Sequence, residues 1–110
     1  MLNRVEVSGQ LVERKALRHT PAGVPVSEGR IAHHSRLQEA GLPREVECEV
    51  PVMALGETAR WLEATPLGSL VGLTGFLAAR GKSSKSLVLH VTQIEFLEGK
   101  ENGKVLQEEG

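Results

Sequence analysis

The chain has 110 residues, of which 40% are hydrophobic and 25% charged, and its formal net charge is −1. This length and balance predict one globular domain with a core of its own, and no apolar run is long enough to span a membrane. The N-terminus lacks the apolar segment of a signal peptide, and the only cysteine, Cys48, excludes an internal disulfide, so we expect a cytoplasmic protein.

The near-neutral total hides a strong segregation of charge along the chain. Residues 1–44 carry seven basic and four acidic side chains, whereas residues 45–63 carry one basic and five acidic. Residues 64–94 carry three basic side chains and no acidic one, and residues 95–110 carry two basic and five acidic. The basic regions are therefore where contacts to a phosphate backbone are expected.

The first predicted strand lies at residues 4–11, which alternate strictly between polar and apolar side chains. Its apolar face consists of Val5, Val7, Gly9 and Leu11. A basic loop follows at residues 14–23 and ends in a Pro/Gly turn. A second strand is expected at residues 24–35, interrupted near Gly29, before a break at residues 38–43.

The third predicted strand, residues 44–52, is a second strict alternation. One face carries Val46, Cys48, Val50 and Val52, and the other carries Glu45, Glu47 and Glu49. We expect the apolar face in the core, where Cys48 would be a buried, unreactive thiol, and the glutamates in solvent. Pro51 indicates that this strand ends, or lies at a sheet edge, at that position.

A short helix and a β-hairpin complete the predicted domain. The helix is expected at residues 56–64, with Ala59, Leu62 and, as a further candidate, Trp61 facing inward, and Thr65-Pro66 ends it. Apolar runs at residues 70–77 and 87–91 flank a Gly/Ser-rich segment that holds all three charges of the acid-free region. Two strand-like runs joined by such a segment predict a hairpin with a basic tip.

The order of these elements, with three strands, a short helix and two more strands, predicts an all-β barrel. Chains of this kind hide their strand edges by closure, and a five-stranded barrel with a short helix between strands three and four is the OB-fold. We expect residues 1–97 to form this domain. Residues 98–110 are charged and poor in large apolar groups, so we expect them to be a flexible tail.

The motifs that suggest catalysis or metal binding lack the neighbouring residues that such sites require. Residues 81–83 (Gly-Lys-Ser) resemble the end of a P-loop, but the earlier glycine that the motif requires is replaced by Phe76, and a strand-like run follows. His33 and His34 point to opposite faces of a strand and do not form a shared metal site. The chain contains no Asp, and its strand glutamates form a solvated face, so we expect no enzyme activity, metal or cofactor.

The remaining candidate site is electrostatic. The predicted loop after the first strand contains Arg14, Lys15 and Arg18, and the loop between the last two strands contains Arg80, Lys82 and Lys85. In an OB barrel these two loops flank the face that binds oligonucleotides. Two basic loops at one groove favour binding to a phosphate backbone, whereas surface lysines that only maintain solubility are the alternative.

Short segments across residues 3–97 also carry a family resemblance. They are Asn3-Arg4, Ser8-Gly9, Pro21-Ala22-Gly23-Val24-Pro25, Glu39-Ala40-Gly41, Cys48, Pro51-Val52, Gly75-Phe76, Val88-Leu89-His90 and Gln93-Ile94-Glu95. In this order and at near-constant spacing, they resemble the primosomal replication protein N family of bacterial replication-restart factors. The resemblance implies an OB-fold homodimer that binds single-stranded DNA without sequence preference. It also implies that the protein stimulates the primosomal restart helicase and has other primosome proteins as partners.

The resemblance also implies which residues contact DNA, namely Arg18, His34, Arg44 and the basic residues at 80–85. With the basic loop after the first strand, the candidate single-stranded-DNA-binding residues are Lys15, Arg18, His34, Arg44, Arg80, Lys82 and Lys85. Glu47 and Leu42 stand where this family can place aromatic rings. Because a ring contributes about 1–3 kcal/mol of stacking per base, we expect weaker binding than in ring-bearing relatives, carried mainly by charge.

Two other functions are compatible with the sequence. A protein–protein adaptor would use the same barrel to dock a helicase or another primosome partner, chiefly through the acidic strand face. An RNA-binding protein is also compatible, because a basic groove does not by itself distinguish RNA from DNA. One physical feature favours a dimer: residues 87–91 are apolar on both strand faces apart from His90, more than a barrel wall with one wet side requires.

Overall fold

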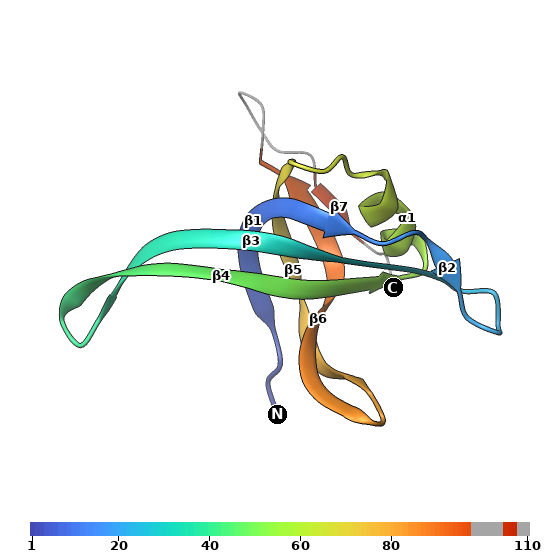
Figure 1. Ribbon diagram of the computed structural model, residues 1–110, viewed down its shortest axis with the longest axis horizontal. Coiled ribbons are helices and arrows are strands. Elements are labelled where there is room, and N and C mark those ends of the chain that lie inside the picture. The colour runs from blue at the N-terminus through green and yellow to red at the C-terminus, as the bar shows by residue number, and fades with distance from the viewer. Residues whose placement is uncertain (98–104, 108–110) are drawn as a thin grey trace.

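The computed structural model describes residues 1–97 and 105–107 and shows a β-barrel with two projecting hairpins (Figure 1). Its elements are β1 (Val5–Arg14), β2 (Arg18–His19), β3 (Pro25–Glu39), β4 (Leu42–Leu55), α1 (Glu57–Ala64), β5 (Leu70–Gly81), β6 (Ser84–Phe96) and β7 (Val105–Gln107). In the described part, no helix has the length and apolar character needed to cross a membrane.

Five of these strands close into a ring. The order of pairing is β1-β5-β6-β4-β3, and β1 pairs again with β3. All neighbours in the ring are antiparallel except β4 and β6, which are parallel and are joined by two residue pairs, Val52 with Leu89 and Met53 with His90. The predicted five-stranded barrel is confirmed, with α1 placed after its third strand, between β4 and β5.

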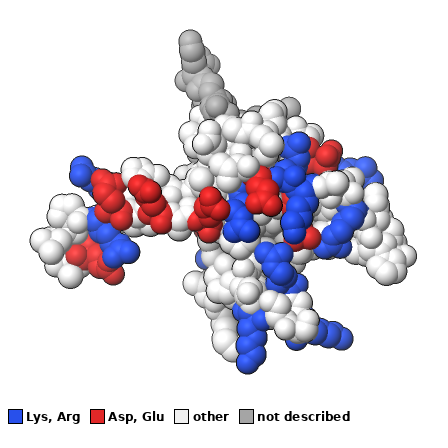
Figure 2. Space-filling model, viewed as in Figure 1, with Lys and Arg blue, Asp and Glu red and all other residues white. Residues whose placement is uncertain are grey.

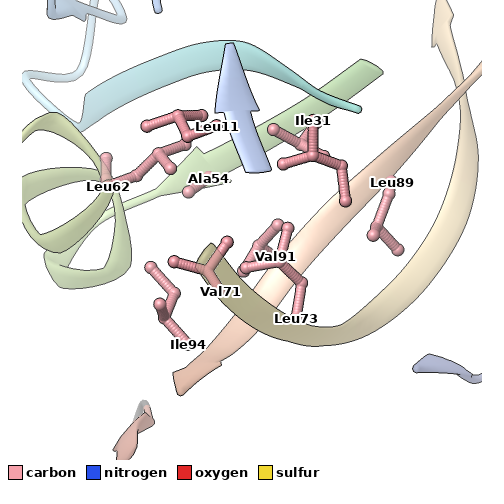
Figure 3. Packing of buried hydrophobic residues seen from close by; sticks show 11 residues of the cluster. Leu11, Ile31, Ala54, Leu62, Val71, Leu73, Leu89, Val91 and Ile94 are labelled. Carbon is pink, nitrogen blue, oxygen red and sulfur yellow. The ribbon is translucent and has the colours of Figure 1, made fainter. Parts of the chain in front are cut away.

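The core follows the alternation read from the sequence. Eleven buried residues from β1, β3, β4, α1, β5 and β6 pack together inside the barrel (Figure 3). Leu11, Ile31 and Leu89 are fully buried there, as are Ala59 and Leu62 of α1. The helix thus covers one end of the barrel with Ala59 and Leu62, as the sequence predicted, and the third candidate, Trp61, packs partly buried against the same core.

Gly75 marks a very close approach of two strands. It pairs with Val91 at a shift in the β5–β6 register, between Thr74 and Gly75. A Cβ at this position would overlap the carbonyl oxygen of His90, a backbone atom that cannot rotate away. Glycine in a strand marks such sites, so the absence of a side chain here is a requirement of the fold.

The β3–β4 hairpin extends well beyond the barrel as an arm, residues 33–48 (Figure 1). Its fourteen paired positions end at a two-residue turn in which Ala40 and Gly41 have φ values of 55° and 79°. Two positive φ values match the tight hairpin turns that suit strand twist. The predicted break at residues 38–43 is therefore too wide, and β3 is continuous through Gly29, where an interruption was expected.

Two expectations about the third strand are corrected by this arm. Cys48 is exposed and not a buried thiol, and Val46 and Val50 are only partly buried. Along the arm β3 and β4 pair with each other, and among the described residues no further strand pairs with either. Alternation identified the strand correctly, but the strand meets the core only at its second half, where Val50 packs partly buried against it and Val52 is fully buried. It continues past Pro51, which lies just before the pairing with β6 begins.

The physical hint of a dimer from residues 87–91 is also corrected. Leu89 and Val91 point into the main core, whereas Val88 is buried in a second cluster with Val26 and Met53. Leu87 alone among these apolar side chains stays exposed. Both apolar faces of this run are therefore largely covered within one chain, so the run carries no argument for a second copy.

The predicted C-terminal tail falls mostly outside the described residues, at 98–104 and 108–110. Within it, β7 (Val105–Gln107) pairs antiparallel with β6, at Gln93, Ile94 and Glu95. The sequence did not predict this strand, because three residues are too few for a periodicity to be recognised.

Candidate nucleic-acid interface

Basic side chains gather on the outer face of the barrel, over β3 and β4, and on the β5–β6 hairpin below it (Figure 2). The arm on the same view carries acidic and basic side chains interspersed with one another. On the arm the two signs are paired, with Arg36 bonded to Glu45 and Arg44 to Glu39, so the excess of basic side chains lies on the barrel face and the β5–β6 hairpin.

Glu28 lies at the centre of the basic cluster. Its side chain is 14% exposed, and each carboxylate oxygen accepts a charged hydrogen bond of 2.9 Å: Oε2 from Arg18 and Oε1 from Arg80. The backbone N–H of Lys15 donates to the backbone carbonyl of Glu28 at 2.9 Å. One carboxylate thus joins the segment after β1 to the β5–β6 hairpin, so Lys15, Arg18 and Arg80 are brought together as the sequence predicted.

The ionisation of Glu28 follows from these neighbours. Burial acts to raise the pKa of Glu28, but the hydrogen bond from Arg18 and the charges of Lys15, Arg18 and Arg80 outweigh it and hold the pKa below its ordinary value. Glu28 is therefore ionised at neutral pH. Its contribution to stability is present above the ordinary carboxyl pKa and is lost as the pH falls through the lowered value.

Lys82 and Lys85 occupy the tip of the β5–β6 hairpin, beyond Arg80. Both are exposed, as is Lys15, and none of the three forms an ion pair with another described residue. Their ammonium groups are hydrated and free to meet an anion. The tip turns at residues 82–83, between Gly81 and Ser84, in agreement with the predicted hairpin.

His34 and Arg44 lie apart from this cluster, on the arm. The His34 Nε2 atom is 2.8 Å from Glu45, and Arg44 donates to Glu39 at 3.1 Å beside the turn. Both pairs are exposed, so each contributes little to stability and is easily exchanged for another partner. The structure does not bring these two predicted contacts to the basic cluster.

Sequence reasoning missed the part played by Glu28 and misjudged that of Arg14. Glu28 is the only acidic residue between positions 14 and 38, a stretch with five Arg and Lys residues, and this isolation was the available signal. Arg14 donates to the carbonyl of Thr65 at the end of α1. That guanidinium therefore holds the helix on the barrel.

A separate open groove of about 1000 Å³ lies between β1 and the arm. Its lining includes His33, His34, Glu47 and Glu49 but no Lys or Arg. His33 is fixed there by contacts of Nδ1 with the Ser8 carbonyl and of Nε2 with the Ser35 hydroxyl. Volume alone does not make this groove a phosphate site, because its carboxylates, Glu47 and Glu49, repel phosphate and no Lys or Arg lines it.

Comparison with known proteins agrees with this architecture. Residues 3–93 match the family model described as "another single-strand binding protein family". The chain is 42% identical over 98 residues to the replication restart protein PriB of Bordetella pertussis strain Tohama I, covering 89% of this chain and 92% of that relative. The chain belongs to the PriB family. It is also 40% identical over 89 residues to PriB of Nitrosomonas europaea, covering 81% of this chain and 82% of that one.

The barrel is similar in fold to solved structures of PriB and of a single-stranded DNA binding protein. The fold superposes on PriB of Ralstonia solanacearum with a TM-score of 0.83 and 32% identity, covering 89% of this chain and all of that one. It is also similar to the single-stranded DNA binding protein of Thermus aquaticus, with a TM-score of 0.71 and 27% identity over 90% of this chain and 52% of that one. The expected OB-fold and family are thus confirmed.

Proposed function

We propose that this PriB-family chain binds single-stranded DNA through its phosphate backbone and acts, without a catalytic step, in bacterial replication restart. The observation that carries the proposal is the convergence of basic side chains from two separate hairpins on one face of the barrel (Figure 2). Phosphate contacts of this kind are independent of base sequence. The replicating chromosome lies in the cytoplasm, which is where the protein would act.

The three unpaired lysines, Lys15, Lys82 and Lys85, would make the first phosphate contacts. Arg18 and Arg80 would add further contacts as phosphate oxygens compete with Glu28 for their guanidinium groups. His34 and Arg44 would contact DNA only where the strand continues along the arm and displaces Glu45 and Glu39.

The proposal is tested by titrating a fluorescently labelled oligonucleotide at several salt concentrations. Three to five phosphate contacts predict a slope of log K against log salt of about −2 to −3.5 for a single strand. Affinity should fall roughly 20- to 100-fold between 50 and 200 mM salt. No binding at the lower salt concentration, or binding that ignores salt, would contradict the electrostatic mechanism.

Replacing Glu28 with glutamine is expected to strengthen DNA binding about three- to tenfold. The amide keeps the shape of the side chain but no longer competes with phosphate for Arg18 and Arg80. One negative charge costs a phosphate roughly 0.6 kcal/mol at about 7 Å in water, and more where solvent is partly excluded. The measurement is the Kd at fixed salt, with the salt slope determined in parallel.

The control for this variant is Glu63→Gln, which changes the net charge equally at an exposed position on α1. Its affinity should stay within about twofold of wild type, since the charge lies away from the cluster. A weaker complex with Glu28→Gln alone would show instead that the carboxylate orients the two arginines for DNA.

Partners and assembly extend the proposal. From the family resemblance we propose a homodimer that contacts the primosomal restart helicase and other primosome proteins. Residues 5–9 of β1 pair with β5 on one side and with no described strand on the other. Apart from the Ser8 carbonyl, which His33 contacts, this leaves backbone groups available to a second chain. Sedimentation of a monomer at micromolar concentration would exclude the dimer.

A protein–protein adaptor is the second candidate function, and the arm is the observation that favours it. Glu45, Glu47 and Glu49 are exposed on a hairpin that leaves the barrel, where a basic partner surface could reach them. Binding of RNA in place of DNA is tested by competition between matched oligonucleotides.

A further inference from the structure

Among the Phe and Trp side chains of the described residues, Phe76 is the only exposed one. Of the three aromatic residues in the chain, Trp61 and Phe96 are partly buried against the main core. Phe76 is 39% exposed, on the outer face of β5. If any Phe or Trp ring of this chain stacks on a base, it is therefore this one.

The ring of Phe76 is held in place by a second ring. It lies directly across the β5–β6 ladder from His90, and the two rings are stacked with centroids 5.1 Å apart and planes 10° apart. The neighbouring Gly75 allows the strands to approach closely at this point. A ring fixed by its neighbour loses little conformational freedom on binding, which favours it as a stacking surface.

The surroundings of the pair suit a flat, partly polar ring. A hollow of about 240 Å³ lies beside the pair, with Val24, Leu55, Val91 and Thr92 in its lining. The lining is mainly apolar, with the His90 ring and the Thr92 side chain as its polar groups. Flat heteroaromatic ligands need such apolar contact together with a few hydrogen-bonding groups.

The stacked pair belongs to the same hairpin as the basic tip. Arg80 follows Phe76 by four residues along β5, roughly 13 Å at the rise of a strand, and Lys82 and Lys85 lie just beyond it. His90 is the parallel partner of Met53, and Met53 pairs with Glu28. The ring pair and the carboxylate that holds Arg18 and Arg80 are thus linked strand by strand across the barrel.

We propose that the Phe76–His90 pair is a nucleobase-stacking site, which rests on the proposed binding of single-stranded DNA. Phosphates bound by the basic hairpin lead the strand past this pair, and an unpaired base stacks on the exposed part of the Phe76 ring. Any base has a π face, so the site adds affinity without sequence preference. The pair then supplies stacking that Glu47 and Leu42 do not supply.

The test compares a thymidine oligonucleotide with an abasic oligonucleotide of equal length. Both present the same phosphates, so the ratio of their affinities isolates contacts to bases. Phe76→Leu keeps an apolar side chain but removes the π face, and we expect it to weaken binding of the thymidine oligonucleotide roughly fivefold or more. Its binding of the abasic oligonucleotide and its salt slope should be unchanged, because stacking releases no counterions.

Phe76→Trp supplies the second readout, since its indole fluorescence should be quenched by the thymidine oligonucleotide and not by the abasic one. Leu87→Ala, at an exposed apolar position of the same hairpin, is the control and should bind both oligonucleotides as wild type does. Equal ratios of thymidine to abasic affinity in wild type and Phe76→Leu would overturn the stacking site while leaving phosphate binding intact. A change in sedimentation without a change in that ratio would also overturn it and assign the patch to an interface between copies. Absence of binding to either oligonucleotide by wild type would overturn the proposed function as well.

Discussion

Gly75→Ala is expected to destabilise the barrel by at least about 3 kcal/mol, which lowers the Tm by roughly 12 °C or more for a domain of this size. The new Cβ would overlap the backbone carbonyl of His90, so β5 and β6 would have to separate at their point of closest approach. The φ angle of Gly75 lies outside the left-handed region, so the effect is steric and not conformational. Thermal denaturation followed by circular dichroism measures it.

Two glycines of the same strand serve as controls. At Gly72 an added Cβ would meet side-chain atoms of Glu95 and Leu97 at 3.7 Å and beyond, and at Gly81 it would meet nothing within 4 Å. Alanine at either position should shift the free energy of unfolding by less than about 1 kcal/mol. If Gly75→Ala melted together with these controls, the close strand approach would not be needed for the fold.

Charge reversal at the hairpin tip, Lys82→Glu with Lys85→Glu, is expected to weaken binding of single-stranded DNA by about 2–3 kcal/mol, or roughly 30- to 150-fold. Two attractive charges become repulsive, and neither lysine has an ion pair among the described residues that the change would disturb. Loss of two phosphate contacts should also make the salt slope less steep by about 1.4. Stability should change little, because both side chains are exposed.

The controls for this variant separate local contact from net charge. Lys82→Gln with Lys85→Gln changes the net charge by the same amount as Arg60→Glu on α1, yet only the former should weaken binding. If the charge-reversed variant loses DNA binding but still contacts the helicase, the result supports the DNA-binding function. Unchanged DNA binding with lost helicase contact would favour the adaptor function.

Strand positions and strand faces could be predicted from the sequence because alternation depends on local residue types. The apolar face of β1 and the inward side chains of α1 are where the sequence predicted them. The solvent exposure of Cys48 could not be predicted in this way. A strand with one apolar face reads the same whether that face meets a core or, as on the arm, meets solvent.

The candidate site was predictable only in part. The basic loops are visible in the sequence, but the bond from Arg80 to Glu28 joins residues 52 positions apart and depends on how the β5–β6 hairpin curves. The two-residue turn was missed because Ala40 is a rare choice for a positive φ angle, which Asn or Gly usually adopts. The first feature depends on tertiary arrangement, and the second on the pairing of β3 with β4 across the turn.

The two-pair contact between β4 and β6 has a thermodynamic consequence. The barrel consists of β1 and two long hairpins, β3–β4 and β5–β6, and this seam joins the two hairpins directly. Arg18 and Glu28 lie on the side of the first hairpin, and the basic tip belongs to the second. A DNA strand held by both hairpins would bridge the seam. Binding of the strand would therefore stabilise the closed barrel, and a more stable seam would in turn raise the affinity for DNA.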